Sequence, residues 1–300
     1  MSDFLFRPPG SGDKLTPILE RSRARTDLRV YEVGGWWGTV AFTESPYPGF
    51  SPVVTDDWVV VVAGGPALRF DVTHRPFRSR LYTEQVLQRH RSGEIRWQDD
   101  LSGPFAVLIV DRKIGAVTLV TDRFLMIPVY TGRAPDLELV GTGPDTINAA
   151  LGRGAESLDP VSVSDFLLNG AITYPFTAYR DIEQLAPGSV YRKIPVDQTT
   201  QSRWRRTSHF TPDPSDRFAS MRSAGRHVKR GLEADIDFHL ARPGPVGAFQ
   251  SAGEDSRLIN GLLYERRIYD SLIFLSRENR EGRTARRAAK RHGSSSRIAP

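Results

Sequence analysis

The sequence predicts an α+β domain followed by an α/β domain. Short β-prone runs, broken by Gly, Pro, Asp and Asn, fill roughly the first 200 residues. A proline-rich polar stretch comes next, and after it helix and strand patterns alternate, as they do in βαβ units with a parallel sheet. With 39% hydrophobic residues, 300 residues can build two ordinary cores. We predict domains at 1–206 and 217–300, joined by a linker at 207–216.

The first domain carries the clearest strand signals. Nearly continuous apolar runs at 58–65 and 105–111 are typical of strands covered on both faces. A third run, at 116–122, follows across four residues that include a glycine, which favours a β-hairpin. Helices are expected at 83–91 and, after the start signal "LDP", at 162–168. These elements indicate a layered domain of sheets and helices.

The second domain should begin with an amphipathic helix. Its apolar stripe has steps of three or four residues and comprises Phe218, Met221, Gly225, Val228, Leu232 and Ile236. Strands are expected at 246–250 and 269–275, and helices at 255–266 and 279–292. The last segment, "HGSSSRIAP", reads as a frayed tail. Two parallel strands make a poor sheet, so exposed apolar faces here would favour association with a separate polypeptide.

Composition excludes several classes of function. The chain has no cysteine, and therefore no disulfide, thiolate metal site or cysteine nucleophile. It lacks a signal-peptide pattern at its start and any run of about 20 apolar residues, so we expect a cytoplasmic protein without a membrane partner. The net charge of +6 comes largely from an arginine-rich segment after residue 275. No aromatic residues interleave there, which argues against a nucleic-acid partner.

Metal chemistry finds little support in the histidines. The six histidines form no HxxxH or HExxH pattern. In "DIDFH", Asp235, Asp237 and His239 have an alternate spacing that would suit metal ligands on a strand face. The preferred interpretation is a helix-exit turn before the next strand.

Several motifs, taken together, resemble one family. The stretch at 101–132 carries Asp122, Arg123, Pro128 and Tyr130 in the places of a D-R-x-G-x-x-P-L-Y signature that follows a buried hairpin. "LDPVSVSDFLLNGAI" and "YRDIEQLAPGSVYR", closed by Trp204, look like the end of the same domain. "SAGEDSR", at 251–257, is similar to an S-G-G-x-D-S pyrophosphate loop. In this order, over roughly residues 58–292, they resemble asparagine synthetases.

The resemblance implies an N-terminal-nucleophile αββα domain of the glutamine amidotransferase type. A truncated α/β ATP-pyrophosphatase domain, of the HUP-like class, would follow. In the family a first-domain cysteine hydrolyses glutamine, and the second domain adenylates a carboxylate that the released ammonia attacks. Relatives without the cysteine, such as β-lactam synthetases and lasso-peptide cyclases, use an amine on the substrate instead.

The family's nucleophile position is Ser2 in this chain. A hydroxyl beside its own α-amine can act as a nucleophile, but it is much weaker than a thiol at neutral pH. The family's glutamine-holding N-G-E stretch has no counterpart. Arg69 either matches the arginine that holds the glutamine carboxylate or is a surface charge at a strand end. We therefore expect no glutaminase activity.

The loop at 251–256 has donors suited to phosphate. Ser251 and Ser256 bring hydroxyls, Gly253 permits close backbone approach, and the following helix start favours an anion. By resemblance, Asp255 holds Mg²⁺ beside ATP, the two expected cofactors. Ala252 replaces the family's first glycine. If that position is left-handed, alanine costs about 1–2 kcal/mol; otherwise its methyl crowds the nucleotide. The alternative role of these residues is helix capping alone.

Two functional hypotheses follow. The first is an asparagine-synthetase-like amide ligase that adenylates a small-molecule or peptide carboxylate. The family's synthetase domain continues for a few hundred residues past its loop, so this enzyme would need a missing C-terminal part, from a separate polypeptide, or would act as a homodimer. The second is a non-catalytic remnant or assembly partner with the same fold and at most weak nucleotide binding.

Overall fold

The computed structural model describes eleven segments of the chain: residues 3–10, 13–22, 27–70, 80–135, 137–193, 204–210, 218–241, 246–268, 270–273, 280–291 and 295–298. These form two compact units, the first ending at Phe210 and the second beginning at Phe218. Each unit has its own sheets and helices.

Two six-stranded antiparallel sheets make up the first unit. The first sheet has the order β12-β10-β11-β1-β3-β2, with β1 Phe4–Arg7, β2 Val30–Gly35, β3 Gly38–Thr43, β10 Tyr130–Ala134, β11 Leu137–Gly141 and β12 Ile182–Gln184. The second has the order β14-β13-β9-β8-β5-β4, with β4 Val53–Val54, β5 Trp58–Gly64, β8 Phe105–Asp111, β9 Ala116–Thr121, β13 Ser189–Lys193 and β14 Arg205–His209. The predicted hairpin is therefore confirmed as β8 and β9.

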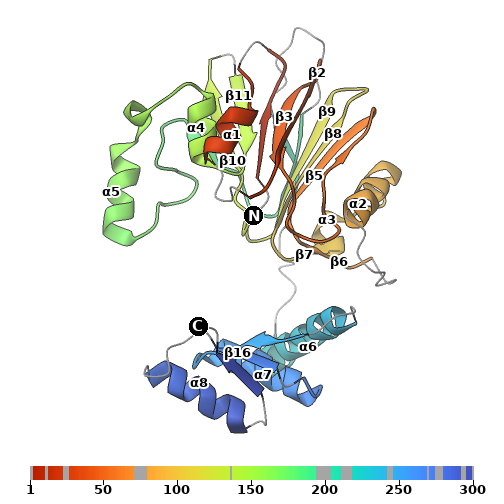
Figure 1. The fold of residues 1–300 in the computed structure, drawn as a ribbon, viewed down its shortest axis with the longest axis vertical. Helices are drawn as coiled ribbons and strands as arrows, with labels where there is room; N and C mark the ends of the chain where they lie inside the picture. The colour runs from red at the N-terminus through yellow and green to blue at the C-terminus, as the bar shows by residue number, and fades with distance from the viewer. Residues whose placement is uncertain are drawn as a thin grey trace. The chain divides into compact units, whose positions relative to one another are not determined.

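Helices cover the outer face of each sheet (Figure 1). Helices α1 (Thr16–Ser22) and α4 (Pro144–Ala150) pack on the first sheet, and α2 (Leu81–Ser92) packs on the second. Near α2 lie α3 (Trp97–Asp100) and the short pair β6 (Ala67–Leu68) and β7 (Leu101–Ser102). The first unit thus has the expected αββα layers.

Strand β5 shows why its sequence is apolar throughout. Val59 and Val61 enter the core between the sheets, whereas Val60 and Val62 enter the core beneath α2. Successive side chains of a strand point to opposite faces. A strand that lies between two cores therefore needs apolar residues on both of its faces.

One helix of the first unit covers no sheet. Helix α5 (Pro160–Asn169) follows the 3₁₀ turn Ala155–Ser157 and stands away from the two sheets in Figure 1. It begins at the predicted start signal, where the Asp159 carboxylate accepts from the Ser162 N–H at 3.0 Å. Most of its apolar side chains remain exposed, including Leu167 and Leu168.

The second unit contains a three-stranded parallel sheet. Its order is β15 (Ala248–Phe249), β16 (Asp270–Ile273), β17 (Ser295–Ile298). The helices are α6 (Met221–Leu240), α7 (Glu254–Glu265) and α8 (Arg280–Arg291). The prediction of a frayed tail was wrong for β17, because the parallel neighbour β16 supplies a pairing that local composition does not reveal.

Two further expectations need correction. Strand β14 continues to His209, so the predicted linker at 207–216 starts too early. The "DIDFH" segment lies inside α6, not in a turn at its exit. Helical geometry puts Asp235 and Asp237 on different faces, and Asp237 pairs with Arg266 of the α7 end at 3.0 Å. Among the described residues, no three acidic or histidine side chains are grouped for a metal.

A search of the described helices found none with both the length and the apolar character required to cross a membrane.

Candidate functional site

The loop between β15 and α7 gathers the predicted phosphate ligands. The Ser251 and Ser256 hydroxyl oxygens lie 2.8 Å apart, and the Gly253 N–H donates to the Ser251 Oγ at 3.0 Å. The Ser251 N–H also donates to the Ser256 Oγ, at 3.2 Å. The structure thus brings together three of the five residues predicted for this site, at the start of a twelve-residue helix.

Two buried amides support this loop, and sequence reasoning missed both. The Asn260 side-chain N–H₂ donates to the Phe249 carbonyl at 3.0 Å and to the Ser256 carbonyl at 2.7 Å. The Gln250 Nε2 donates to the Ser251 carbonyl at 2.6 Å. Both side chains are buried. The available signal was the polar Asn260 on the otherwise apolar face of α7, one turn beyond Ser256.

The backbone at Ala252 settles how alanine fits there. Among the described residues, the non-glycine positions with positive φ are Leu125, Asp181 and Arg267. Ala252 is absent from this group, and Gly253 has φ −65°. Neither position is left-handed, so alanine brings no such strain.

The beginning of α7 presents donors without a side-chain cap. Gly253 is the N-cap residue and offers no side chain to the first helical N–H groups. Glu254 and Asp255 lie in the first turn with exposed side chains. The Arg257 guanidinium is nearby, with Nε 3.3 Å from the Gly253 carbonyl oxygen. Hydroxyls, backbone N–H groups and the helix dipole together favour an anion at this end of the helix.

The predicted nucleophile, Ser2, lies outside the described residues. The next residue, Asp3, makes hydrogen bonds to the chain on both sides of β1. Its N–H donates to the Oγ1 of Thr43, at the end of β3, at 2.8 Å. The Oγ1 of Thr142, just after β11, donates to its carboxylate at 3.3 Å. Burial raises the pKa of Asp3, and the Thr142 hydrogen bond opposes that shift. The entry to β1 is therefore anchored at the centre of the first sheet.

Arg69 lies just after β6 and is exposed. Its N–H donates to the Asp100 carbonyl at 2.9 Å, and its Nη2 is 3.5 Å from the Ser102 Oγ. These contacts belong to the β6–β7 pair. The role of Arg69 with glutamine stays a prediction.

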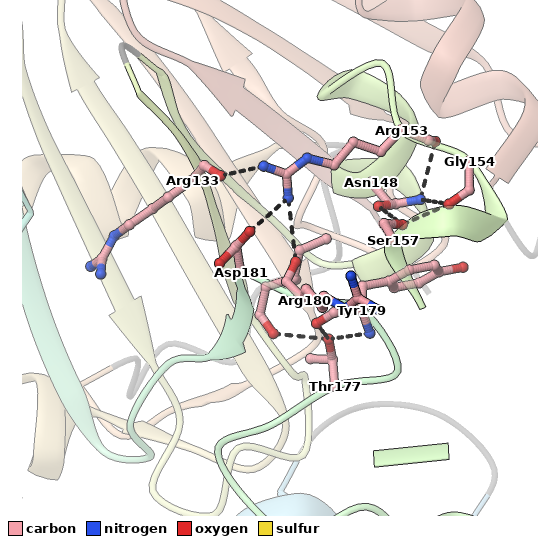
Figure 2. A network of polar contacts seen from close by, with 10 residues as sticks. Arg133, Asn148, Arg153, Gly154, Ser157, Thr177, Tyr179, Arg180 and Asp181 are labelled. Carbon is pink, nitrogen blue, oxygen red and sulfur yellow. Dashed lines mark hydrogen bonds and ion pairs between the residues drawn. The ribbon is translucent and has the colours of Figure 1, made fainter. Parts of the chain in front are cut away.

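A polar network braces the segment that carries α5 (Figure 2). The Arg153 guanidinium donates to the carbonyls of Arg133, at 2.9 Å, and Arg180, at 3.3 Å. Its Nη1 also lies 3.4 Å from the Asp181 carboxylate. One arginine thus joins β10, the α4 exit and the start of β12.

A second part of the network involves the turn before α5. The Ser157 hydroxyl donates to the Asn148 Oδ1 at 2.7 Å, and the Asn148 Nδ2 donates to the Gly154 carbonyl at 3.3 Å. The Thr177 hydroxyl donates to the Ile182 carbonyl at 2.8 Å. These contacts join the turn before α5 to the end of α4 and hold the chain before β12, which indicates a structural role.

Comparisons with known proteins bear mainly on the first unit. A family model described as "Glutamine amidotransferase domain" matches residues 67–205. No curated protein sequence matches the chain.

Two solved structures are similar at low identity. One is a glutamine phosphoribosylpyrophosphate amidotransferase from B. subtilis complexed with ADP and GMP, with 12% identity, 93% of this chain covered and a TM-score of 0.34. The other is an allosteric regulatory enzyme of purine biosynthesis, with 12% identity, 99% coverage and a TM-score of 0.35. This chain spans 61% of the first structure and 74% of the second. On the family match, the first unit contains a glutamine amidotransferase-like domain.

Proposed function

We propose that this amidotransferase-like protein binds Mg-ATP at the loop 251–256 and activates a carboxylate for amide formation, the reaction type of the asparagine synthetases. The observation that carries the proposal is the cluster of Ser251 Oγ, Ser256 Oγ and the Gly253 N–H at the start of α7. Polyphosphate groups suit a site of this kind, because several donors meet the positive end of a helix dipole.

Each residue of the loop has a role in the proposal. Ser251 and Ser256 donate hydroxyl hydrogen bonds to phosphate oxygens once their mutual contact opens, and the Gly253 N–H adds a backbone donor. Asp255 is exposed in the first turn of α7 and is free of the loop's own hydrogen bonds, so its carboxylate fits a magnesium ligand. When bound, ATP supplies the adenylyl group that makes a carboxylate reactive, and Mg²⁺ offsets the phosphate charge.

The substrate and partners belong to the same proposal. The acceptor is a small-molecule or peptide carboxylate, and the nitrogen comes from an amine, because Ser2 replaces the family's thiol. The remaining acceptor pocket is supplied by a separate polypeptide or by a second copy of the chain. The support is the small size of the second unit's sheet, which has three strands among the described residues.

Calorimetric titration with Mg-ATP tests the proposal. We expect saturable binding that weakens about tenfold in Ser251→Ala, since a hydrogen bond to a charged group contributes roughly 1.5–3 kcal/mol. Asp255→Ala should lose the magnesium dependence. Asp235→Ala is a matched control, because this carboxylate lies on α6 and outside the loop.

Three results would count against the enzyme. Absence of binding, or equal binding by the Ser251→Ala and Asp235→Ala variants, would favour the second hypothesis, a non-catalytic assembly partner. Binding without carboxylate-dependent pyrophosphate exchange, measured with the completing polypeptide present, would remove the adenylation step.

A further inference from the structure

The strand register of the second sheet creates an uneven outer surface. Trp58, Asp111 and Ala116 are paired across β5, β8 and β9, so they share one row. In the next row Ile109 pairs with Thr118, and Thr118 pairs with Arg192 of β13. Directly paired residues point to the same face of a sheet. Large side chains therefore flank two small ones, Ala116 and Thr118.

A pocket of about 300 Å³ occupies this surface. It is lined by Trp58, His90, Arg91, Ile109, Asp111, Ile114, Ala116, Thr118 and Arg192. The last turn of α2 supplies His90 and Arg91, and the β8–β9 turn supplies Ile114. The volume is at the lower end of the range for small-molecule sites, roughly 300–1,000 Å³. None of these residues belongs to the loop 251–256.

Positive charge dominates the rim. Arg91 and Arg192 are both exposed, and the Arg91 guanidinium lies 5.9 Å from the centre of the Trp58 ring. The Asp111 carboxylate is directed to the hairpin turn, where its Oδ1 accepts from the N–H groups of Lys113, at 2.9 Å, and Ile114, at 3.3 Å. The guanidinium charge is therefore only partly offset within the pocket.

His90 lies between two aromatic rings. Its ring centroid is 6.3 Å from that of Trp58 and 6.0 Å from that of Trp97 on α3. Burial lowers the pKa of His90, the positive charge of Arg192 lowers it further, and Asp111 acts in the opposite direction. The surroundings therefore favour the neutral form of the imidazole. An anion beside it would raise its pKa, and by linkage that anion would bind more tightly as the pH falls.

We propose that this pocket binds a small organic anion with a flat apolar body, of the aromatic carboxylate class. Arginine pairs with planar carboxylates through its forked N–H groups, so Arg91 and Arg192 would hold the charged end. Trp58, Ile109 and Ala116 would contact the ring. The Thr118 hydroxyl supplies one further polar contact at the floor. This site is additional to the proposed nucleotide loop and does not depend on it.

Benzoate and acetate are the probes for this pocket. Each is titrated into the full chain, while NMR follows the His90 ring signals, assigned with the variant His90→Gln. We expect saturable benzoate binding, an upward shift of the His90 pKa at saturation, and tighter binding at pH 6 than at pH 8. Arg192→Gln should weaken benzoate binding at least tenfold. Arg21→Gln, which removes an exposed guanidinium on α1, should not change it.

Three outcomes would overturn the proposal. The first is the absence of saturable benzoate binding to the folded chain. The second is an equal loss in Arg192→Gln and Arg21→Gln, which would indicate general charge attraction. The third is equal affinity for acetate and benzoate, because contacts of Trp58, Ile109 and Ala116 with the ring should favour benzoate. Unchanged far-ultraviolet circular dichroism of each variant confirms that it is folded.

Discussion

Asp122 illustrates how one side chain organises a turn. It is 1% exposed, and its two carboxylate oxygens accept four backbone N–H groups: those of Phe124, at 2.9 Å, and Met126, at 3.1 Å, on Oδ1, and those of Phe105, at 3.3 Å, and Ile127, at 3.0 Å, on Oδ2. This explains physically why an aspartate stands at the head of the D-R-x-G-x-x-P-L-Y-like signature.

Replacing Asp122 should destabilise the first unit. In Asp122→Ala two buried and two part-buried N–H groups lose their acceptor, and we expect the free energy of unfolding to fall by at least about 2 kcal/mol. Asp122→Asn keeps one oxygen acceptor, so its free energy of unfolding should lie between that of Asp122→Ala and that of the unmodified chain. Urea unfolding followed by tryptophan fluorescence measures both. The exposed Asp56→Asn is the control, and equal midpoints for all variants would contradict this role for Asp122.

Helices α4 and α5 follow each other in sequence and differ completely in burial. Ile147 of α4 is fully buried and sits so close to Gly132 of β10 that a Cβ there would be 2.3 Å from its Cγ2. Leu168 of α5 is 83% exposed. Local sequence does not distinguish the two helices, because both carry apolar residues. Their burial depends on whether a sheet lies beside the helix: α4 packs on the first sheet, and α5 covers none.

This contrast makes a direct prediction about stability. Ile147→Ala should lower the free energy of unfolding by about 2–5 kcal/mol, as a core truncation does. Leu168→Ala should change it by less than about 0.5 kcal/mol, because little of the Leu168 surface is buried. Thermal and urea unfolding of the two variants test the difference. A large loss in Leu168→Ala would show that α5 is covered in solution.

Elements were predictable from sequence where local pattern determined them. The apolar hairpin, the start of α5 and helix α7 all carry strong local signals. Strand β17 was missed because its serine-rich sequence is strand-like only beside β16. The loop 251–256 could be predicted as a unit because its residues are contiguous. The pocket at Trp58 could not, because its lining residues meet only through the register of four strands and the packing of α2 on them.

At the scale of the molecule, the two units differ in length and in the burial of their helices. The first unit has three clusters of buried side chains, between its sheets and beneath its helices. In the second unit, none of the residues of the twenty-residue helix α6 is buried. The second unit is also the shorter of the two, and a shorter unit buries a smaller fraction of its surface on folding, so we expect it to be the less stable one.

Calorimetry of the whole chain should therefore show two unfolding transitions. We assign the transition at lower temperature to the second unit. Mg-ATP should raise the temperature of this transition alone, because a ligand stabilises the unit that binds it. At a concentration of about 100 times Kd, the gain is roughly 2.7 kcal/mol. A single transition, or an equal rise of both, would contradict independent unfolding of the units.

The backbone angles at Ala252 and Gly253 determine which substitutions this loop can accept during evolution. Both residues have negative φ, a conformation that any L-amino acid can adopt, so the backbone does not require glycine at 252. Which residues are tolerated at 252 then depends on the size of the side chain. Such a loop can drift away from its glycine signature and keep its hydrogen-bond donors in place. A search pattern that insists on paired glycines would pass over chains of this kind.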